Sequence, residues 1–268
     1  MARMNRFFIV SLMACLFACA TVPLTERRSL NLVPDSEIIA LSLQQYKEVL
    51  GKSKLSQDEE KVQMVKRVGE RIARAAEEFM RESGREADVQ GYQWEFNLID
   101  DPKVVNAWCM PGGKVAVYTG ILPVAKDETG LAVIVGHEVA HAIAKHGNER
   151  MSQAMLVQLG GIGLSLALTQ KPAITRQIFQ EAYGITTKVG YVLPYSRLQE
   201  AEADRIGLVL MAKAGYDPRE AIALWERMSR REGGRTVEFL STHPVPETRI
   251  ENIKSLLPEA MRYYKGDR

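Results

Sequence analysis

The sequence predicts a mainly helical α+β fold in which a small β-sheet lies beside a long buried helix. Three observations support this: helical spacing of apolar residues before residue 82, alternating runs between residues 94 and 119, and an apolar segment from Glu128 to Arg150. Of the 268 residues, 46% are hydrophobic and 25% are charged, which excludes wholesale disorder or a low-complexity fibre. The length suits one large domain or two small ones.

The charge balance excludes some partners. The formal net charge is +2, and Arg3 and Arg6 lie in a segment that we expect to be removed. Without these two arginines the net charge is zero. The overall charge therefore does not favour binding to nucleic acid or to an acidic membrane. The three cysteines, Cys15, Cys19 and Cys109, are too few for a disulfide framework.

The first 18 residues are typical of a bacterial secretory signal. A positive start precedes an apolar run from Phe7 to Ala18, which is too short to span a membrane comfortably. The run ends in Leu16-Phe17-Ala18-Cys19, which resembles the lipobox of bacterial lipoproteins. That resemblance implies cleavage before Cys19, lipidation of Cys19 and, because Ala20 follows rather than Asp, an outer-membrane location. The alternative is a plain signal that leaves a soluble periplasmic protein.

We therefore expect a signal peptide over residues 1–18, a lipidated polar tether over 19–34 and one domain over 35–268. The lipid would be the only contact with the membrane. No internal repeat with a period of 20–50 residues is present.

Local sequence signals predict the helices and strands of the domain. The elements expected are, in order, helices over 35–52 and 57–82, strands over 94–99, 104–110 and 114–119, and helices over 128–150, 199–215 and 217–230. Asp58 and Glu59 favour a helix start, because acidic residues are stabilised at helix N-termini. Pro111-Gly112-Gly113 predicts a turn between two strands. Ala214-Gly215 indicates a helix end, and Asp217-Pro218 a new helix start.

The glycine-rich apolar stretch from Ala154 to Leu168 is too short for a membrane span. We favour a buried helix or loop over a mobile lid above a cleft, and both interpretations stay open. This stretch therefore does not predict a segment that crosses a membrane.

The segment His137-Glu138-Val139-Ala140-His141 carries the chemistry. Histidines four residues apart on a helix share one face, and each imidazole nitrogen binds zinc well at about 2.0–2.1 Å. Glu138 can then reach a water at the metal without becoming a ligand. The alternative is an amphipathic helix with two incidental histidines. Apolar neighbours nearly all round predict a buried helix, where unpaired polar groups are costly, and this favours the metal.

A third ligand must come from elsewhere, since catalytic zinc usually has three protein ligands. Glu200 and Asp204 are four residues apart and share a face, whereas Glu202 points away from both. Glu200 could bind the metal while Asp204 accepts a proton from the far nitrogen of a ligand histidine. From spacing alone, a solvated charge cluster is equally possible.

Four segments together resemble the HtpX-like metallopeptidases related to CAAX prenyl proteases, peptidase family M48, and in particular their soluble periplasmic lipoprotein members. The segments are Asn106 to Gly113 with Tyr118-Thr119-Gly120, Gly136 to His141, Tyr195 to Asp204, and Thr242 to Ile250. The likeness runs from about Asp35 to Pro258. It implies a zincin-like domain with one zinc ion (Zn²⁺) per chain, held by His137, His141 and Glu200.

The resemblance also implies that an extended substrate adds to a strand edge beside the zinc helix. The candidate edge is Asn106, Ala107, Trp108, Cys109 and Met110. An ordinary core hairpin is the alternative, and both interpretations can hold. Cys109 is expected to pack as a small apolar residue rather than act as a nucleophile.

Two histidines and one arginine remain. His146 lies about half a turn off the ligand face of a continuous helix, so we interpret it as structural or exposed. The resemblance places His243 near the metal, where it could donate to the oxyanion or occupy the open metal position; a turn histidine is the alternative. Arg249 is expected to pair with a buried acid, either Asp204 or Glu202.

The expected function is zinc-dependent endopeptidase activity on misfolded or stalled envelope proteins, with Glu138 as the base that activates water. The alternative is a latent or non-proteolytic assembly factor for outer-membrane proteins. The partners expected are unfolded polypeptides, and nucleic acid is not among them. A sugar or ester hydrolase is disfavoured, because no second motif suggests one.

Overall fold

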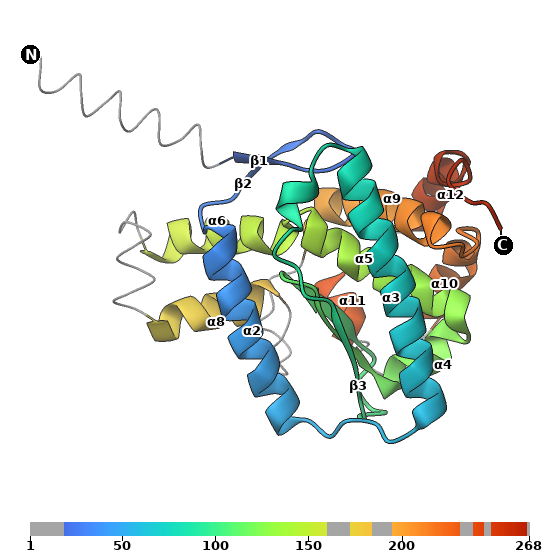
Figure 1. Ribbon diagram of the computed structural model, residues 1–268, viewed down its shortest axis with the longest axis horizontal. Helices are drawn as coiled ribbons and strands as arrows, with labels where there is room; N and C mark the ends of the chain where they lie inside the picture. Colours follow the sequence, from blue (N-terminus) through green and yellow to red (C-terminus); the bar gives the residue numbers. More distant parts are fainter. Residues whose placement is uncertain (1–18, 160–171, 184–194, 231–237, 244–247, 267–268) are drawn as a thin grey trace, which may run out of the picture.

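The computed structural model describes residues 19–159, 172–183, 195–230, 238–243 and 248–266. It confirms the mainly helical α+β class (Figure 1). The strands and the first helices are β1 (Cys19–Thr21), β2 (Arg28–Leu30), α2 (Asp35–Lys52), α3 (Glu59–Glu82), η1 (Glu86–Asp88), β3 (Glu95–Ile99), β4 (Ala107–Met110) and β5 (Lys114–Tyr118). The later elements are η2 (Thr119–Ile121), α4 (Leu122–Ala125), α5 (Glu128–Ile143), α6 (His146–Leu159), α8 (Pro172–Ala182), α9 (Arg197–Lys213), α10 (Glu220–Ser229), α11 (Glu238–Thr242) and α12 (Arg249–Ala260).

The larger sheet has the strand order β3-β5-β4. β3 is parallel to β5, and β4 is antiparallel to β5 with Met110 opposite Lys114. The predicted turn between β4 and β5 is present. Gly112 and Gly113 have φ values of 83° and 78°, a left-handed conformation that glycine adopts without steric cost.

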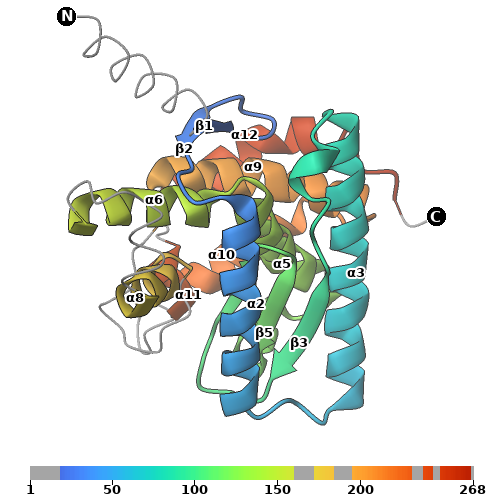
Figure 2. The same cartoon turned by 60° about the vertical axis from the view of Figure 1, so that its left-hand side comes forward.

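Alternate residues of the sheet face two different apolar clusters, as strand geometry requires. Cys109 and Val115 join the residues of α3 and α5, whereas Trp108 and Met110 join those of α2, α6 and α8. Figure 2 shows α2 and α3 on either side of the sheet, with α5 behind it. The sheet therefore lies between the two clusters, and α5 forms the centre of the larger one.

The helix α5 is buried along nearly its whole length, from Gly130 to Ile143, as the apolar sequence predicts. Asp127 caps it by accepting a hydrogen bond from the backbone N–H of Gly130 at 3.0 Å. α9 packs against α5 and begins with a capping box between Ser196 and Gln199. These two helices supply most of the candidate site.

The expected single helix over residues 128–150 is divided in two. α5 ends at Ile143, and α6 begins at His146 after Lys145, which has a left-handed φ of 58°. A non-glycine residue in this conformation costs roughly 1–2 kcal/mol. Lys145 Nζ forms ion pairs with Asp35 at 2.7 Å and with Asp88 at 2.8 Å. The break is therefore accompanied by contacts with residues that lie far away in the sequence.

Residues 19–34, expected to be a tether, include the antiparallel pair β1–β2. Val22 and Val33 are buried, and the Val33 carbonyl accepts a hydrogen bond from Asn148 Nδ2 at 2.8 Å. The expected signal segment 1–18 lies outside the described residues. α6 extends to Leu159, and the rest of the stretch to Leu168 also lies outside them. Within the described ranges, no helix combines the length and apolar character that crossing a bilayer requires.

Candidate metal centre and active site

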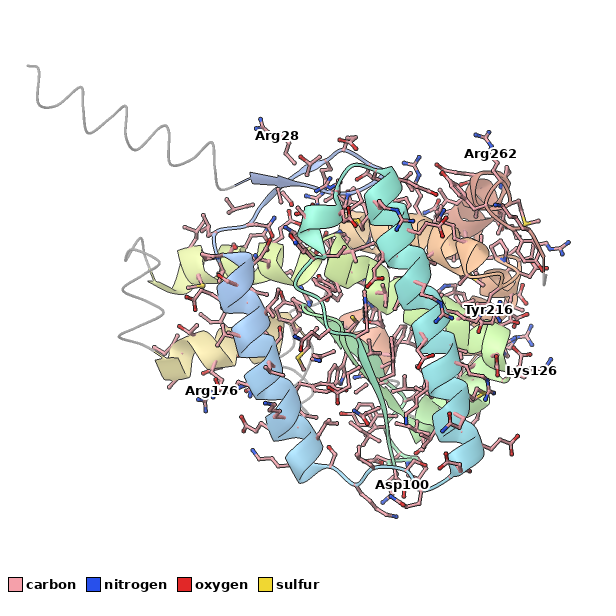
Figure 3. All side chains as sticks on the ribbon, viewed as in Figure 1. Arg28, Asp100, Lys126, Arg176, Tyr216 and Arg262 are labelled. Atoms are coloured by element: carbon pink, nitrogen blue, oxygen red, sulfur yellow. The ribbon has the colours of Figure 1, made fainter. Side chains whose placement is uncertain are left out.

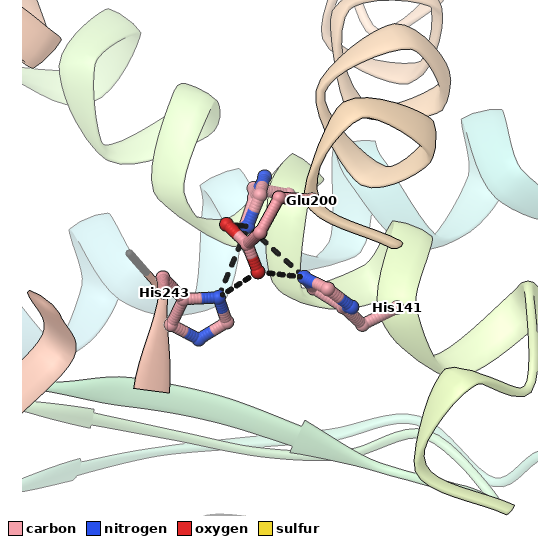
Figure 4. Close-up of side chains that lie close together, drawn as sticks. His141, Glu200 and His243 are labelled. Carbon is pink, nitrogen blue, oxygen red and sulfur yellow. Dashed lines mark hydrogen bonds and ion pairs between the residues drawn. The ribbon is translucent and has the colours of Figure 1, made fainter. Parts of the chain in front are cut away.

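Four side chains from separate parts of the chain converge at the centre of the molecule. His137 and His141 come from α5, Glu200 from the first turn of α9 and His243 from the residue after α11. Their ligand atoms lie within 4.8 Å of one another, and each residue is at most 3% exposed. Figure 4 shows the side chains of His141, Glu200 and His243 pointing toward one another. The structure thus brings together the three predicted ligands and His243.

The distances within this group fit a tetrahedral cation. Two ligands about 2.0–2.1 Å from zinc, at the tetrahedral angle, lie about 3.3–3.4 Å apart. His137 Nε2 lies 3.1 Å from His141 Nε2 and 3.2 Å from His243 Nδ1. Glu200 Oε1 lies 3.3 Å from His141 Nε2 and 2.9 Å from His243 Nδ1. Facing imidazole nitrogens share at most one proton per pair, so this geometry suits a cation held between them.

The electrostatics of the cluster also favour a cation. Burial alone would lower the pKa of His137, but its contacts with Asp204 and Glu200 raise that pKa to about 9. Burial and the neighbouring positive charge of His137 leave the pKa of His141 well below its usual value. The carboxylates therefore attract one proton onto the histidine pair when no metal balances their charge, and histidine and carboxylate are both good zinc ligands.

Asp204 and Arg249 contact the candidate ligands. Asp204 Oδ1 lies 3.0 Å from His137 Nδ1, a contact that fixes the ring so that Nε2 faces the site. Arg249 donates to Asp204 at 2.7 and 2.9 Å and to Glu200 Oε2 at 2.8 Å. Its guanidinium carbon lies 3.5 Å from the centre of the Trp225 ring. Of the two acids proposed for Arg249, the structure selects Asp204 and adds Glu200.

Glu138 lies next to the cluster and has unused hydrogen-bonding capacity. It is 3% exposed, and burial raises its pKa above the usual carboxyl value. Its Oε1 atom has no hydrogen-bond partner among the described residues and lies 3.3 Å from His243 Nε2. A buried carboxylate oxygen without a partner is costly, so a group that binds during function explains it best.

Three further residues, His146, Tyr195 and Arg150, lie against the site, and none of them was given a functional role from the sequence. His146 is fully buried, which makes the exposed interpretation wrong, and its Nδ1 lies 2.9 Å from His141 Nδ1. Tyr195 stacks on His141 with ring centres 3.7 Å apart, and Arg150 lies 3.3 Å from the centre of the Tyr195 ring. Burial raises the pKa of Tyr195 to about 12.

The predicted edge strand is β4, which packs against α5. The Asn106 carbonyl accepts a hydrogen bond from the Tyr118 N–H on the β5 side, so the backbone groups of Ala107 and Cys109 point away from β5 by alternation. The Ala107 N–H donates to Asn106 Oδ1 at 2.9 Å. Trp108 packs edge-on against Tyr46. Cys109 is buried, which raises its thiol pKa well above normal and agrees with an apolar packing role.

Comparison with known proteins places these residues in context. The model of Peptidase family M48 matches residues 65–257. The mitochondrial metalloendopeptidase OMA1 of Schizosaccharomyces pombe is 41% identical over 63% of this chain and 48% of its own length. The Saccharomyces cerevisiae OMA1 is 37% identical over 66% of this chain and 51% of its own. The Beta-barrel assembly-enhancing protease of Escherichia coli is 27% identical over 60% of this chain and 34% of its own.

These relatives correct one expectation. An outer-membrane lipoprotein facing the periplasm is wrong, because the relatives of higher identity are named as mitochondrial enzymes. The chain spans about half the length of the first curated relatives it matches, at 48% and 51%. The family match covers most of the chain, including both helices and the edge strand of the site. The chain therefore belongs to peptidase family M48, whose members are metal-dependent peptidases.

Proposed function

We propose that this chain is a zinc-dependent endopeptidase, with one zinc ion held by His137, His141 and Glu200. The convergence of their ligand atoms, within 4.8 Å of one another and of His243 Nδ1, carries the proposal. A histidine pair with one carboxylate is a common ligand set for catalytic zinc. The helix pair α5–α9 brings these ligands together before any substrate arrives.

The side chains around the metal have distinct roles in peptide hydrolysis. Zinc, when bound, supplies a Lewis acid that polarises the scissile carbonyl and favours loss of a proton from water. Glu138 takes the proton of the attacking water and passes it to the leaving amine. Its burial supports this role, because a raised pKa brings a carboxyl closer to the pH at which it works. Asp204 keeps His137 oriented, and Arg249 holds both Asp204 and Glu200 in place.

The substrates that we propose are misfolded or stalled polypeptides that bind as an extended strand along β4. The backbone groups of Ala107 and Cys109 face away from β5, which is the direction in which an added strand would pair. For a substrate strand to pair with Ala107, the hydrogen bond from the Ala107 N–H to Asn106 Oδ1 must first break. The Escherichia coli relative is named as a protease that enhances β-barrel assembly, which supports substrates that have failed to assemble.

A latent resting state is the second candidate, and His243 favours it. Its Nδ1 lies 2.9 Å from Glu200 Oε1 and 3.2 Å from His137 Nε2, where it would serve as a fourth ligand to a bound metal. Four protein ligands leave no open position for substrate, as in structural zinc sites. In this state the chain would act as a non-proteolytic assembly factor until His243 moves.

The test is hydrolysis of an unfolded polypeptide by purified full-length protein, with zinc and with a chelator. We expect one zinc per chain by elemental analysis and cleavage that the chelator abolishes. Cleavage that persists without metal would disprove the proposal, and one bound zinc with no cleavage would favour the non-proteolytic candidate.

A further inference from the structure

A chain of polar contacts leads from the candidate ligand His141 to the N-terminal strand pair. His141 Nδ1 lies 2.9 Å from His146 Nδ1, and His146 Nε2 lies 3.1 Å from Glu202 Oε2. Arg27 Nε donates to both oxygens of Glu202, at 2.9 and 3.1 Å. Thr25 Oγ1 donates to Glu202 Oε1 at 2.8 Å. The two histidines and Glu202 are each at most 3% exposed.

If His141 binds the metal through Nε2, the donor and the acceptor of each hydrogen bond between His141 and Glu202 are determined. A ligand histidine that binds through Nε2 keeps its proton on Nδ1. His141 Nδ1 therefore donates to His146 Nδ1, which must accept. The proton of His146 is then on Nε2, which donates to the Glu202 carboxylate. Asp204 orients His137 by direct contact with its Nδ1 atom. Glu202 would orient His141 in the same way, but through the imidazole of His146, which lies between them.

The last residue of this series of polar contacts, Arg27, belongs to a segment outside the helix pair α5–α9. Arg27 lies between β1 and β2. It also donates two hydrogen bonds to Glu149 on α6, at 2.7 and 2.8 Å. Gln199 Nε2 donates to the same Glu149 at 2.7 Å. Figure 2 shows the β1–β2 pair above α6 and α9. The position of Arg27, and with it the hydrogen bonds that Arg27 donates to Glu202, depends on this strand pair staying docked.

We propose that residues 19–30 act as a positioning element of the metal centre, with Arg27, Glu202 and His146 orienting His141. Docking of this segment then sets the affinity for zinc and provides a route to regulate it. The proposal rests on the proposed function, because it needs a metal at His141. Partners of ligand histidines usually contribute 10–100-fold to metal affinity.

The test measures the zinc dissociation constant of full-length protein by competition with a chelator, and the absorption spectrum of the cobalt-substituted form. We expect Arg27→Ala to weaken zinc binding about tenfold, and Glu202→Gln and His146→Leu about 10–100-fold, with an altered cobalt spectrum. His146→Gln should restore most of the affinity, since its amide both accepts and donates. The matched control is Arg28→Ala, because Arg28 is exposed and points away from the body of the protein (Figure 3).

The double variant Arg27→Ala/His146→Leu distinguishes a chain from independent effects. If the residues act in series, the double variant binds zinc no more weakly than His146→Leu alone. Wild-type affinity and spectrum in folded Arg27→Ala and Glu202→Gln would overturn the proposal. Wild-type zinc binding by His141→Ala would instead overturn the proposed function, so the two failures are distinguishable.

Discussion

Gly136 and Gly207 face each other where α5 crosses α9, and a Cβ atom on Gly207 would lie 3.0 Å from the backbone nitrogen of His137. A Cβ on Gly136 would lie 3.1 Å from the Gly207 carbonyl oxygen. A Cβ atom at either position would require the neighbouring backbone to move by a few tenths of an ångström. The contact between the two glycines fixes the separation between the histidines of α5 and Glu200 of α9.

The first prediction concerns this crossing. Gly207→Val should push α9 away from α5 and weaken zinc binding more than it lowers the melting temperature, because ligand spacing tolerates little movement. Calorimetric titration with zinc and thermal unfolding measure the two effects. Gly51→Ala is the control, since nothing lies within 4 Å of its added Cβ. Equal zinc affinity in a folded Gly207→Val protein would contradict the prediction.

The second prediction concerns the base. Glu138→Gln should keep one zinc per chain and lose cleavage, because an amide cannot take the proton of water while the ligands remain intact. Loss of a general base typically costs about 10²–10⁴-fold in turnover. Cleavage of an unfolded polypeptide and elemental analysis of the same sample test both halves. Undiminished proteolysis by this variant would disprove the role of Glu138.

The third prediction concerns His243, for which two roles have opposite signs. Because its Nδ1 lies among the ligand atoms, we expect His243→Ala to raise basal cleavage by opening a metal position. An oxyanion donor would behave differently, since its loss lowers turnover about 10²–10³-fold. Turnover measured at saturating substrate separates the two. A fall of that size would exclude the latch.

The fourth prediction concerns acid stability. Burial would raise the pKa of Glu202, but hydrogen bonds from His146, Arg27 and Thr25 lower it to about 2 from an ordinary value of 4.5. A lowered folded-state pKa stabilises the protein above pH 4.5, and this contribution is lost as pH falls from 4.5 toward 2.

Urea unfolding between pH 5 and 3 should therefore show a shallower loss of stability in Glu202→Gln than in the wild type. The difference in slope should approach one proton, or about 1.4 kcal/mol per pH unit. Glu60→Gln, at an exposed position on α3, is the control. Identical slopes for Glu202→Gln and the wild type would show that Glu202 is not stabilised in this way.

Local spacing predicted much of the fold. The helix over Asp35–Lys52 matches its expected bounds, and Asp58 caps the helix that it was expected to start. The Pro111-Gly112-Gly113 turn joins the antiparallel strands that it was expected to join. These features depend on periodicity and turn chemistry, which a short window of sequence contains.

The features that were not predicted from the sequence involve contacts between residues that lie far apart along the chain. Lys145 has a left-handed backbone conformation, and its ammonium group pairs with Asp35 and Asp88, which lie far from it in the sequence. Without that break, His146 would lie half a turn from His141 rather than against it. The partners of Arg249 were open for the same reason, because spacing along α9 does not say which acid faces α12.

The separation of the site residues along the chain has a consequence for biosynthesis. The two histidines of α5 leave the ribosome first, but Glu200 lies 59 residues beyond His141 and Arg249 lies 49 residues further still. A nascent chain that ends before α9 holds the histidine pair without its carboxylate. It cannot assemble the metal centre or hydrolyse its neighbours while it is being made. Peptidase activity thus appears only when nearly the whole domain has been translated and folded, since such long-range contacts form late.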